Sequence, residues 1–298
     1  LDCLLLEDVQ ISSSLTAIKH HTFMGCPKLT KIFIPASIEF IGKGAFKNCP
    51  SIAQVSFENL SKIKKIEKNA FEECKLLAQI SLPSSLMSIG SGIFRSDSSL
   101  TEINIPSSVT SINKFSFKEC ISLEKVSFPS KLTSIDEYAF YKCFSLKKII
   151  IPPSVTSIGE CAFNICQKIT EIEFDKASSL ISIGKQAFSR LLCLKKIAIP
   201  STVKSIGSYA FLGCSSLDCI LFESGNSDLY IGERAFMGCS SLKQMSFPSS
   251  TKSIDDYAFS GCKLLKKIVL PSSLTSIGKN LFFQCLTLTE ILFEFNYK

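Results

Sequence analysis

Several residue types on which enzyme chemistry depends are scarce in this chain of 298 residues. Tryptophan is absent, and histidine occurs only twice, as the adjacent His20 and His21. Neighbouring side chains point in different directions, so both imidazoles are expected at the surface. Arginine occurs only at Arg95, Arg190 and Arg234, although the net charge is +7. Because arginine makes the bidentate contacts to guanine and phosphate, this lysine-rich excess argues against specific nucleic-acid binding.

Long apolar segments and known catalytic motifs are also missing. No apolar run approaches the ~20 residues of a membrane-spanning helix, so membrane insertion is not expected. No basic segment followed by an apolar one precedes a small-residue cleavage site, so a signal peptide is either absent or already removed. The chain has no G-x-S-x-G elbow, no phosphate-binding G-x₄-G-K-[ST] loop and no dinucleotide-binding G-x-G-x-x-G motif. These absences predict a protein that is not an enzyme and that holds no cofactor.

Phenylalanine, with 24 copies, is abundant and periodic. The repeat spacing is 23 residues in eight of eleven steps and 25 in the other three, and an isoleucine stands five residues before each repeat phenylalanine. The repeat phenylalanines are Phe23, Phe46, Phe71, Phe94, Phe117, Phe140, Phe163, Phe188, Phe211, Phe236, Phe259 and Phe282. A fixed period of this length is the signature of a repeat protein with one continuous core. We therefore expect residues 1–298 to form a single array of twelve repeats that is open in mid-repeat at both ends.

Each repeat has the same order of local signals. Leu146–Ile151 alternates as a half-buried strand should, and proline ends this strand in eight of the twelve repeats. A second short strand carries the repeat isoleucine. Glycine follows it in seven repeats, and Asn113, Asp136 or Asp255 in three others, which predicts left-handed backbone there. About one turn of helix is expected around the phenylalanine.

The pattern Leu-x-x-Ile-x-Ile-Pro-x-x-Val-x-x-Ile-Gly-x-x-Ala-Phe-x-x-Cys resembles the BspA-like class of leucine-rich repeats over essentially the whole chain. Ile151 to Cys166 matches it with one residue per position. The resemblance implies an α/β leucine-rich repeat solenoid with coils of 23 to 25 residues and a parallel sheet on the concave side. Short helical turns and second short strands are expected elsewhere in each coil.

The 14 cysteines are mostly part of the same repeat. Eleven occupy one phase: Cys3, Cys26, Cys49, Cys74, Cys120, Cys143, Cys166, Cys214, Cys239, Cys262 and Cys285. Successive coils bring these positions within disulfide range, but parallel side chains have poorly directed Cβ vectors. Cysteine is also a common buried filler, so a ladder of reduced thiols is favoured over disulfides. The chain has no C-x₂-C pair, so no metal site is expected.

The three 25-residue steps occur where an acid replaces the strand-ending proline, at Glu58, Asp175 and Glu223. Two extra residues enlarge the same corner, which predicts bulged loops around Asn59, Ser178 and Asn226. Asn59-Leu60-Ser61 is a glycosylation sequon that would be usable in a secreted chain. Because neither end carries a polar cap, we expect a longer array, end-to-end contact or a capping partner.

The outward face of the strands varies between repeats and is the candidate ligand-binding surface. In the C-terminal half, lysine rows alternate with acidic rows, and exposed apolar residues stand among them, a mixture typical of interfaces. The candidate residues are Lys147, Lys148, Ile150, Lys195, Lys196, Leu221, Lys243, Lys266, Lys267 and Val269. A solvated charged sheet is the alternative interpretation of the same lysines.

These observations predict a non-enzymatic interaction module that binds a protein or an acidic polymer through the concave face. The family resemblance implies a cell-surface or secreted adhesion protein. The alternative is a cytoplasmic scaffold within a larger assembly, which the free cysteines favour.

Overall fold

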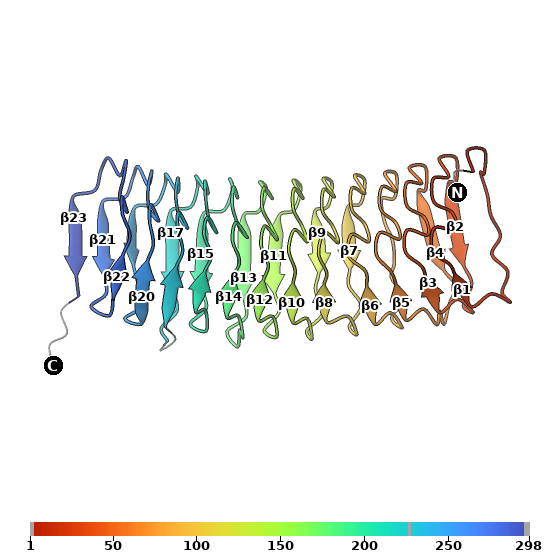
Figure 1. Ribbon diagram of the computed structural model, residues 1–298, viewed down its shortest axis with the longest axis horizontal. Helices are drawn as coiled ribbons and strands as arrows, with labels where there is room; N and C mark the ends of the chain where they lie inside the picture. The colour runs from red at the N-terminus through yellow and green to blue at the C-terminus, as the bar shows by residue number, and fades with distance from the viewer. Residues whose placement is uncertain (1–2, 226–227, 295–298) are drawn as a thin grey trace. The chain divides into compact units, whose positions relative to one another are not determined.

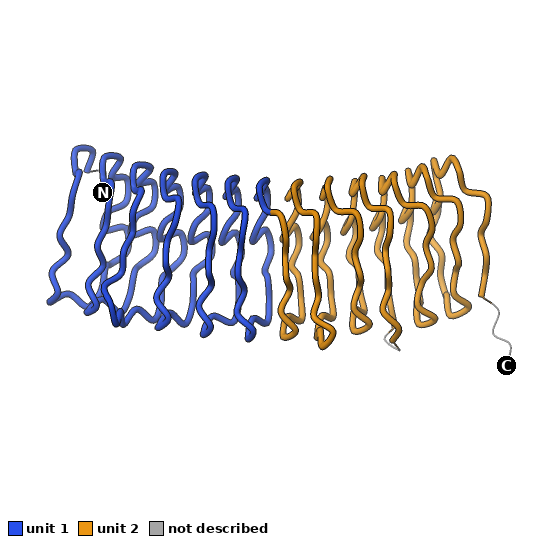
Figure 2. Tube along the Cα trace, turned by 180° about the vertical axis from the view of Figure 1, so that it is seen from behind, with its two compact units in different colours: residues 1–146 blue, residues 147–298 orange. Residues whose placement is uncertain are grey.

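The computed structural model describes residues 3–225 and 228–294. The chain forms two compact units, residues 1–146 and 147–298 (Figure 2). Each unit contains six of the repeat phenylalanines and is described by itself. Within each unit, successive repeats form coils that lie side by side (Figure 1). The continuity of residues 1–298 as one array stays a prediction.

Unit 1 contains two sets of parallel strands, here called long and short strands. The long strands are β2 (Lys31–Ile34), β4 (Gln54–Phe57), β7 (Glu102–Asn104) and β9 (Lys125–Ser127), paired as β2–β4 and β7–β9. The short strands are β1 (Ala17–Ile18), β3 (Phe40–Ile41), β5 (Lys65–Ile66), β6 (Ser88–Ile89), β8 (Ser111–Ile112) and β10 (Ser134–Ile135). They pair in parallel in the order β1-β3-β5-β6, and β8 pairs with β10.

Unit 2 repeats this arrangement. Its long strands are β11 (Lys148–Ile151), β13 (Glu171–Phe174), β15 (Lys196–Ile199), β17 (Cys219–Phe222), β19 (Gln244–Ser246), β21 (Lys267–Leu270) and β23 (Glu290–Phe293). Its short strands are β12 (Ser157–Ile158), β14 (Ser182–Ile183), β16 (Ser205–Ile206), β18 (Leu229–Ile231), β20 (Thr251–Ile254) and β22 (Ser276–Ile277), which pair in that order. The predicted second set of short strands is therefore confirmed.

The strands form because isoleucine alternates with outward polar residues. In β15, Ile197 and Ile199 are buried, whereas Lys196 and Ala198 are exposed. The register places Ile197 beside Ile220 of the next coil, so equivalent apolar residues stack on one another. Each unit is thus a parallel β-solenoid in which a residue contacts the same repeat position of its neighbours.

The repeat phenylalanines form the centre of each core. In unit 1 the six rings from Phe23 to Phe140 stack with centroids 5.1 to 5.8 Å apart, and in unit 2 the six rings from Phe163 to Phe282 stack at 5.2 to 6.2 Å. Ten of the twelve are fully buried. Near-parallel rings at these distances are a favourable aromatic arrangement, so the ring stack adds to the burial of apolar area.

The predicted α/β class and the one-turn helices are wrong, because the described residues contain no helix. We call the segment around each phenylalanine the turn wall. The residues two before and two after the phenylalanine have φ between 51° and 76° in every coil, and left-handed residues at this spacing interrupt any α-helical run. Asn69, Phe71 and Glu73 instead donate backbone hydrogen bonds of 2.9 to 3.0 Å to the next coil. These bonds offset the cost of about 1–2 kcal/mol for each left-handed residue.

The prediction of left-handed backbone at the glycine after the repeat isoleucine is also wrong. Gly90 and Gly278 do not have positive φ, and neither do Asn113, Asp136 and Asp255 at the same position. A Cβ added to Gly90 would lie 2.2 Å from the Lys68 backbone nitrogen of the preceding coil. Glycine is therefore used because two backbones approach closely, and the left-handed positions lie two residues further along the chain.

The cysteine phase forms a ladder of buried thiols. All 14 cysteines are free, and most of those in the ladder are buried. Eight ladder thiols donate to the carbonyl oxygen of the preceding coil's phenylalanine, with Sγ–O distances of 3.0 to 3.4 Å. Burial raises the pKa of Cys49 to about 11 and that of Cys214 to about 12. These two thiols therefore stay protonated at neutral pH, where each fills space and donates to a carbonyl.

The acids that replace proline bind backbone amides in two of the enlarged corners. Glu58 Oε2 accepts a hydrogen bond from Ala36 N at 2.7 Å, and Asp175 Oδ1 accepts one from Ala177 N at 2.8 Å. Leu60, beside Asn59, is 93% exposed, whereas Ser178 is buried. The predicted loop at Asn226 lies outside the described residues.

Loss of a stacked ring should destabilise the protein locally. We expect Phe71→Ala to lower the free energy of unfolding by about 3–5 kcal/mol through lost burial and a cavity. Hydrogen exchange should rise mainly in the coils of Phe46 and Phe94, because contacts run only between neighbouring coils. Phe283→Ala is the control, since this ring is 54% exposed. A uniform loss of protection throughout unit 1 would contradict the expected local effect.

Two glycines of one coil should respond differently to alanine. Gly92 has φ +62°, and the atoms nearest to its added Cβ belong to the Asn69 side chain, at 3.2 Å or more, so Gly92→Ala should cost about 1 kcal/mol. Gly90→Ala should cost more, because its Cβ meets backbone that cannot move without displacing the coil. Urea denaturation of both variants measures the difference, and equal costs would refute the close-approach explanation.

Candidate functional site

The ten candidate residues occupy three positions along the long strands of unit 2, whose outward surface we call the long-strand face. One lysine immediately precedes each of β11, β15, β19 and β21: Lys147, Lys195, Lys243 and Lys266. Another is the first residue of β11, β15 and β21: Lys148, Lys196 and Lys267. The third residues of β11, β17 and β21 are apolar: Ile150, Leu221 and Val269.

Two of these lysines are already neutralised by acids on the adjacent strand. Lys148 Nζ lies 3.0 Å from Glu171 and 2.7 Å from Glu173, and Lys267 Nζ lies 3.2 Å from Glu290. The hydrogen bonds from Lys148 to Glu173 and Glu171 raise the pKa of this lysine, and the same contact lowers the pKa of Glu173. In the β11–β13 pair two carboxylates share the ammonium group of Lys148, so this lysine has no free positive charge for a ligand.

Four lysines of the long-strand face keep an uncompensated charge. Lys195, Lys196, Lys243 and Lys266 are exposed, and no carboxylate of residues 3–225 or 228–294 forms an ion pair with them. Backbone carbonyls of three of them accept hydrogen bonds from the next coil, which fixes their positions at the strand starts. Lys243 and Lys266 precede the paired strands β19 and β21, whereas the Asp218–Cys219 coil separates them from Lys195 and Lys196.

Apolar surface lies further along the same strands. Ile150 and Leu221 are each 57% exposed, whereas Val269 is only partly exposed. A hollow of about 420 Å³ adjoins Leu221 and is lined by Phe222, Ser246, Phe247 and two carboxylates, Glu223 and Glu294. The long-strand face thus carries ammonium groups at the starts of β11, β15, β19 and β21, and carboxylates after the ends of β17 and β23. Ile150 differs from the others because it lies beside Glu173 in the β11–β13 register.

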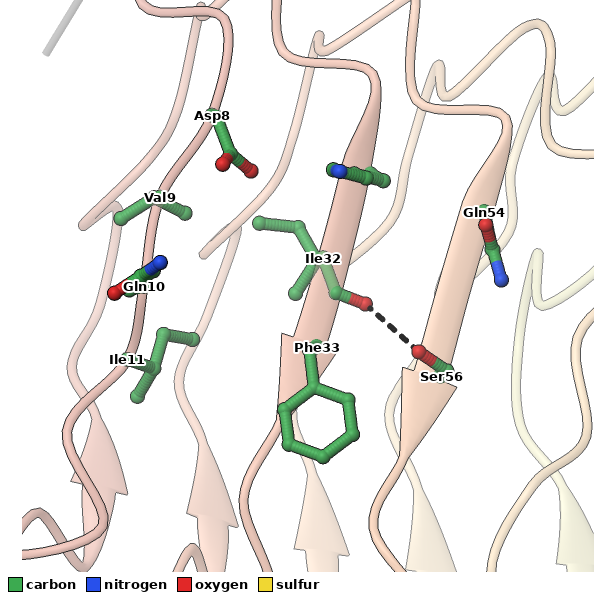
Figure 3. A pocket seen from close by; sticks show the side chains of 9 residues that line it. Asp8, Val9, Gln10, Ile11, Ile32, Phe33, Gln54 and Ser56 are labelled. Carbon is green, nitrogen blue, oxygen red and sulfur yellow. Dashed lines mark hydrogen bonds between the residues drawn. The ribbon is translucent and has the colours of Figure 1, made fainter.

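The long strands of unit 1 carry a functional candidate that the sequence interpretation missed. Phe33 is the third residue of β2 and is 53% exposed. Its side chain points outward (Figure 3). It lies in a hollow of about 420 Å³ with Asp8, Lys31 and Gln54. The sequence did contain a signal for this candidate, because Phe33 stands at an outward strand position where the next coil has Ser56.

Asp97 is a buried carboxylic acid of unit 1. It replaces cysteine in the ladder phase, is fully buried, and accepts a hydrogen bond from Cys74 N to Oδ1 at 2.8 Å. Its Oδ2 has no hydrogen-bond partner among the described residues. Burial raises the pKa of this carboxyl well above its usual range, and the charges of Glu72 and Glu73 raise it further. Glu72, also buried, instead contacts Lys47 Nζ at 2.9 Å and Arg95 Nη1 at 3.6 Å.

Neither a cluster of metal-ligating side chains nor a membrane-spanning helix is found in the described part of the chain. No group of three or more histidine, cysteine, aspartate or glutamate side chains there could hold a metal ion. No helix in residues 3–225 and 228–294 is long and apolar enough to cross a membrane.

Comparison with known proteins gives a family and several structures of the same fold. The model of the BspA type leucine rich repeat region matches in six copies, over residues 1–113, 87–218 and 220–298. A leucine rich cell surface protein from Faecalibacterium prausnitzii is 29% identical, with 99% of this chain and 88% of that chain covered and a TM-score of 0.57. A leucine-rich repeat protein from Bacteroides ovatus is 28% identical, with 93% and 82% covered and a TM-score of 0.59. No protein with curated function matches the chain.

The buried Asp97 should make stability depend on pH. An unfolded aspartate ionises near pH ~4, whereas folded Asp97 keeps its proton to higher pH. Above that pH the unfolded state loses a proton that the folded state retains, so this group lowers the free energy of unfolding as pH rises. Asp97→Cys restores the ladder residue and should raise the melting temperature more at pH ~7.5 than at pH ~4. The exposed Glu102→Gln is the control, and an equal gain at both pH values would contradict this account.

Proposed function

The chain belongs to the BspA-type leucine-rich repeat family, and we propose from this premise that it is a non-enzymatic module that binds an acidic protein surface or acidic polymer. The observation that carries the proposal is the set of four lysines without acidic partners, beside exposed Leu221 on the long-strand face of unit 2. The lysines would attract and orient the ligand, and Leu221 with its hollow would supply desolvated contact.

The chemistry of the described side chains supports binding over catalysis. Buried ladder thiols such as Cys49 and Cys214 have a raised pKa and stay protonated, so they are poor nucleophiles. His20 Nε2 lies 3.0 Å from Glu67 Oε2 on an exposed surface, and its ring packs against Phe40. This imidazole is therefore positioned by a carboxylate, but no serine or cysteine among the described residues donates a hydrogen bond to it.

We further propose a cell-surface or secreted location, with a role in adhesion. The support is the resemblance to the Faecalibacterium prausnitzii cell surface protein, which is 29% identical over nearly the whole chain. The second candidate is a cytoplasmic scaffold, which the 14 free thiols favour because reducing compartments keep cysteines reduced. Detection of the protein on intact source cells with an antibody, before and after permeabilisation, separates the two.

Removal of the unpaired lysines should weaken binding to an acidic probe. Poly-L-glutamate is used as the probe in a biosensor with the intact chain. We expect serine replacement of Lys195, Lys196, Lys243 and Lys266 to slow association at least tenfold and to flatten its salt dependence. Leu221→Ser should instead mainly accelerate dissociation, because a buried contact acts after the encounter.

The matched control removes the same charge from exposed lysines of unit 2 that lie outside the long strands and form no ion pair with a described residue, by serine replacement of Lys168, Lys176, Lys204 and Lys279. This variant should bind the probe nearly as well as the natural chain. If both quadruple variants lose binding equally, net charge alone is responsible and the long-strand face is not the site.

A further inference from the structure

We propose that the hollow around Phe33 in unit 1 is a binding site for a neutral pyranose saccharide. This site lies on other residues and in the other unit from the lysines of the proposed function, so the two proposals stand independently. Its volume of about 420 Å³ falls within the range of small-molecule sites, about 300–1,000 Å³.

The hollow exists because the first coil separates from β2. Residues 8–11 run alongside β2 at the phase of a long strand, but no backbone hydrogen bond joins them to β2 within the described chain (Figure 3). In the next coil, by contrast, β4 pairs with β2 over four residues. The separation leaves Val9 and Ile11 partly exposed and opens the space beside Phe33.

Phe33 supplies an apolar platform in the middle of the site. Phe33 is 53% exposed. Figure 3 shows its ring pointing outward from β2. The face of an aromatic ring carries partial negative charge and attracts polarised C–H groups, such as those on the apolar face of a pyranose. No aromatic residue of the described chain stacks on Phe33, so the ring is available to a ligand.

Polar groups with free hydrogen-bonding capacity surround this ring. Asp8 offers carboxylate acceptors, Lys31 offers ammonium donors, and the amides of Gln10 and Gln54 offer both. None of these four side chains hydrogen-bonds or forms an ion pair with another described residue. Ser56 Oγ donates to Ile32 O at 3.5 Å, which leaves its oxygen able to accept.

The aromatic ring and the surrounding polar groups of this hollow together favour a sugar over other classes of ligand. A purely apolar ligand would cover the four polar side chains and leave them without partners. A charged ligand would be attracted by one of Asp8 and Lys31 and repelled by the other, since the site has one charge of each sign. A neutral pyranose satisfies both requirements, because it has hydroxyl groups at its edge and C–H groups on its face.

The proposal is tested by saturation-transfer difference NMR with the full chain and three disaccharides, maltose, cellobiose and lactose, each at up to about 20 mM. We expect transfer to the ring protons of at least one sugar. Phe33→Ala should remove this signal or weaken the affinity at least tenfold. Phe283→Ala, which removes a ring of equal exposure from unit 2, should leave it unchanged.

A second pair of variants keeps the test decisive if Phe33→Ala folds poorly. Gln54→Ala should weaken binding several-fold, whereas Gln79→Ala, at the same position of the next coil and outside the hollow, should not. The proposal is overturned if none of the sugars binds, or if binding is indifferent to both Phe33→Ala and Gln54→Ala. Contact of an unstructured peptide with Phe33, without contact by any sugar, would also overturn it.

Discussion

Hydrogen bonding between equivalent positions of successive coils is the constraint on which the rest of the structure depends. On two walls of each coil, these hydrogen bonds join neighbouring long strands and neighbouring short strands. On the third, the turn wall, they are donated by backbone amides of the left-handed residues on either side of each phenylalanine. Once these bonds hold each coil against the next, every repeat position must stack on itself. The ring stack, the thiol ladder and the glycine at the close approach of two backbones are three consequences of that single requirement.

Much of the core could be predicted from the sequence, because periodic isoleucine and phenylalanine report burial directly. Both sets of strands and the buried rings are confirmed. The turn wall was mispredicted, because residues such as Tyr138 and Ile165 adopt positive φ there although their side chains disfavour it. Bonds to the next coil impose that geometry, and a local sequence pattern does not show it. Asp97 is visible in the sequence as an exception to the cysteine ladder, but its lack of a partner for Oδ2 is a property of the packing.

The candidate face could be located from the sequence but its charge balance could not. Outward strand positions follow from the period of two, which identified the lysine rows correctly as surface. Neutralisation of Lys148 by Glu171 and Glu173 depends on the register between strands 23 or 25 residues apart. Phe33 was overlooked because Gln54 and Ser56, at the outward positions of the next coil, are polar. Its hollow arises where residues 8–11 separate from β2, and no side-chain pattern in the sequence indicates that separation.

The strict stacking of equivalent positions also determines how such a gene can change length. A deletion of 23 residues, begun anywhere within a 23-residue coil, joins two points of the same phase and regenerates the backbone hydrogen bonds between the new neighbours. Loss of a 25-residue coil also preserves the stacking of equivalent positions, because its two extra residues lie in a corner of the coil. A loss of 24 residues inverts the inward and outward sides of one strand. Unequal recombination can therefore alter the number of coils freely, while the surface that each coil presents is carried along intact.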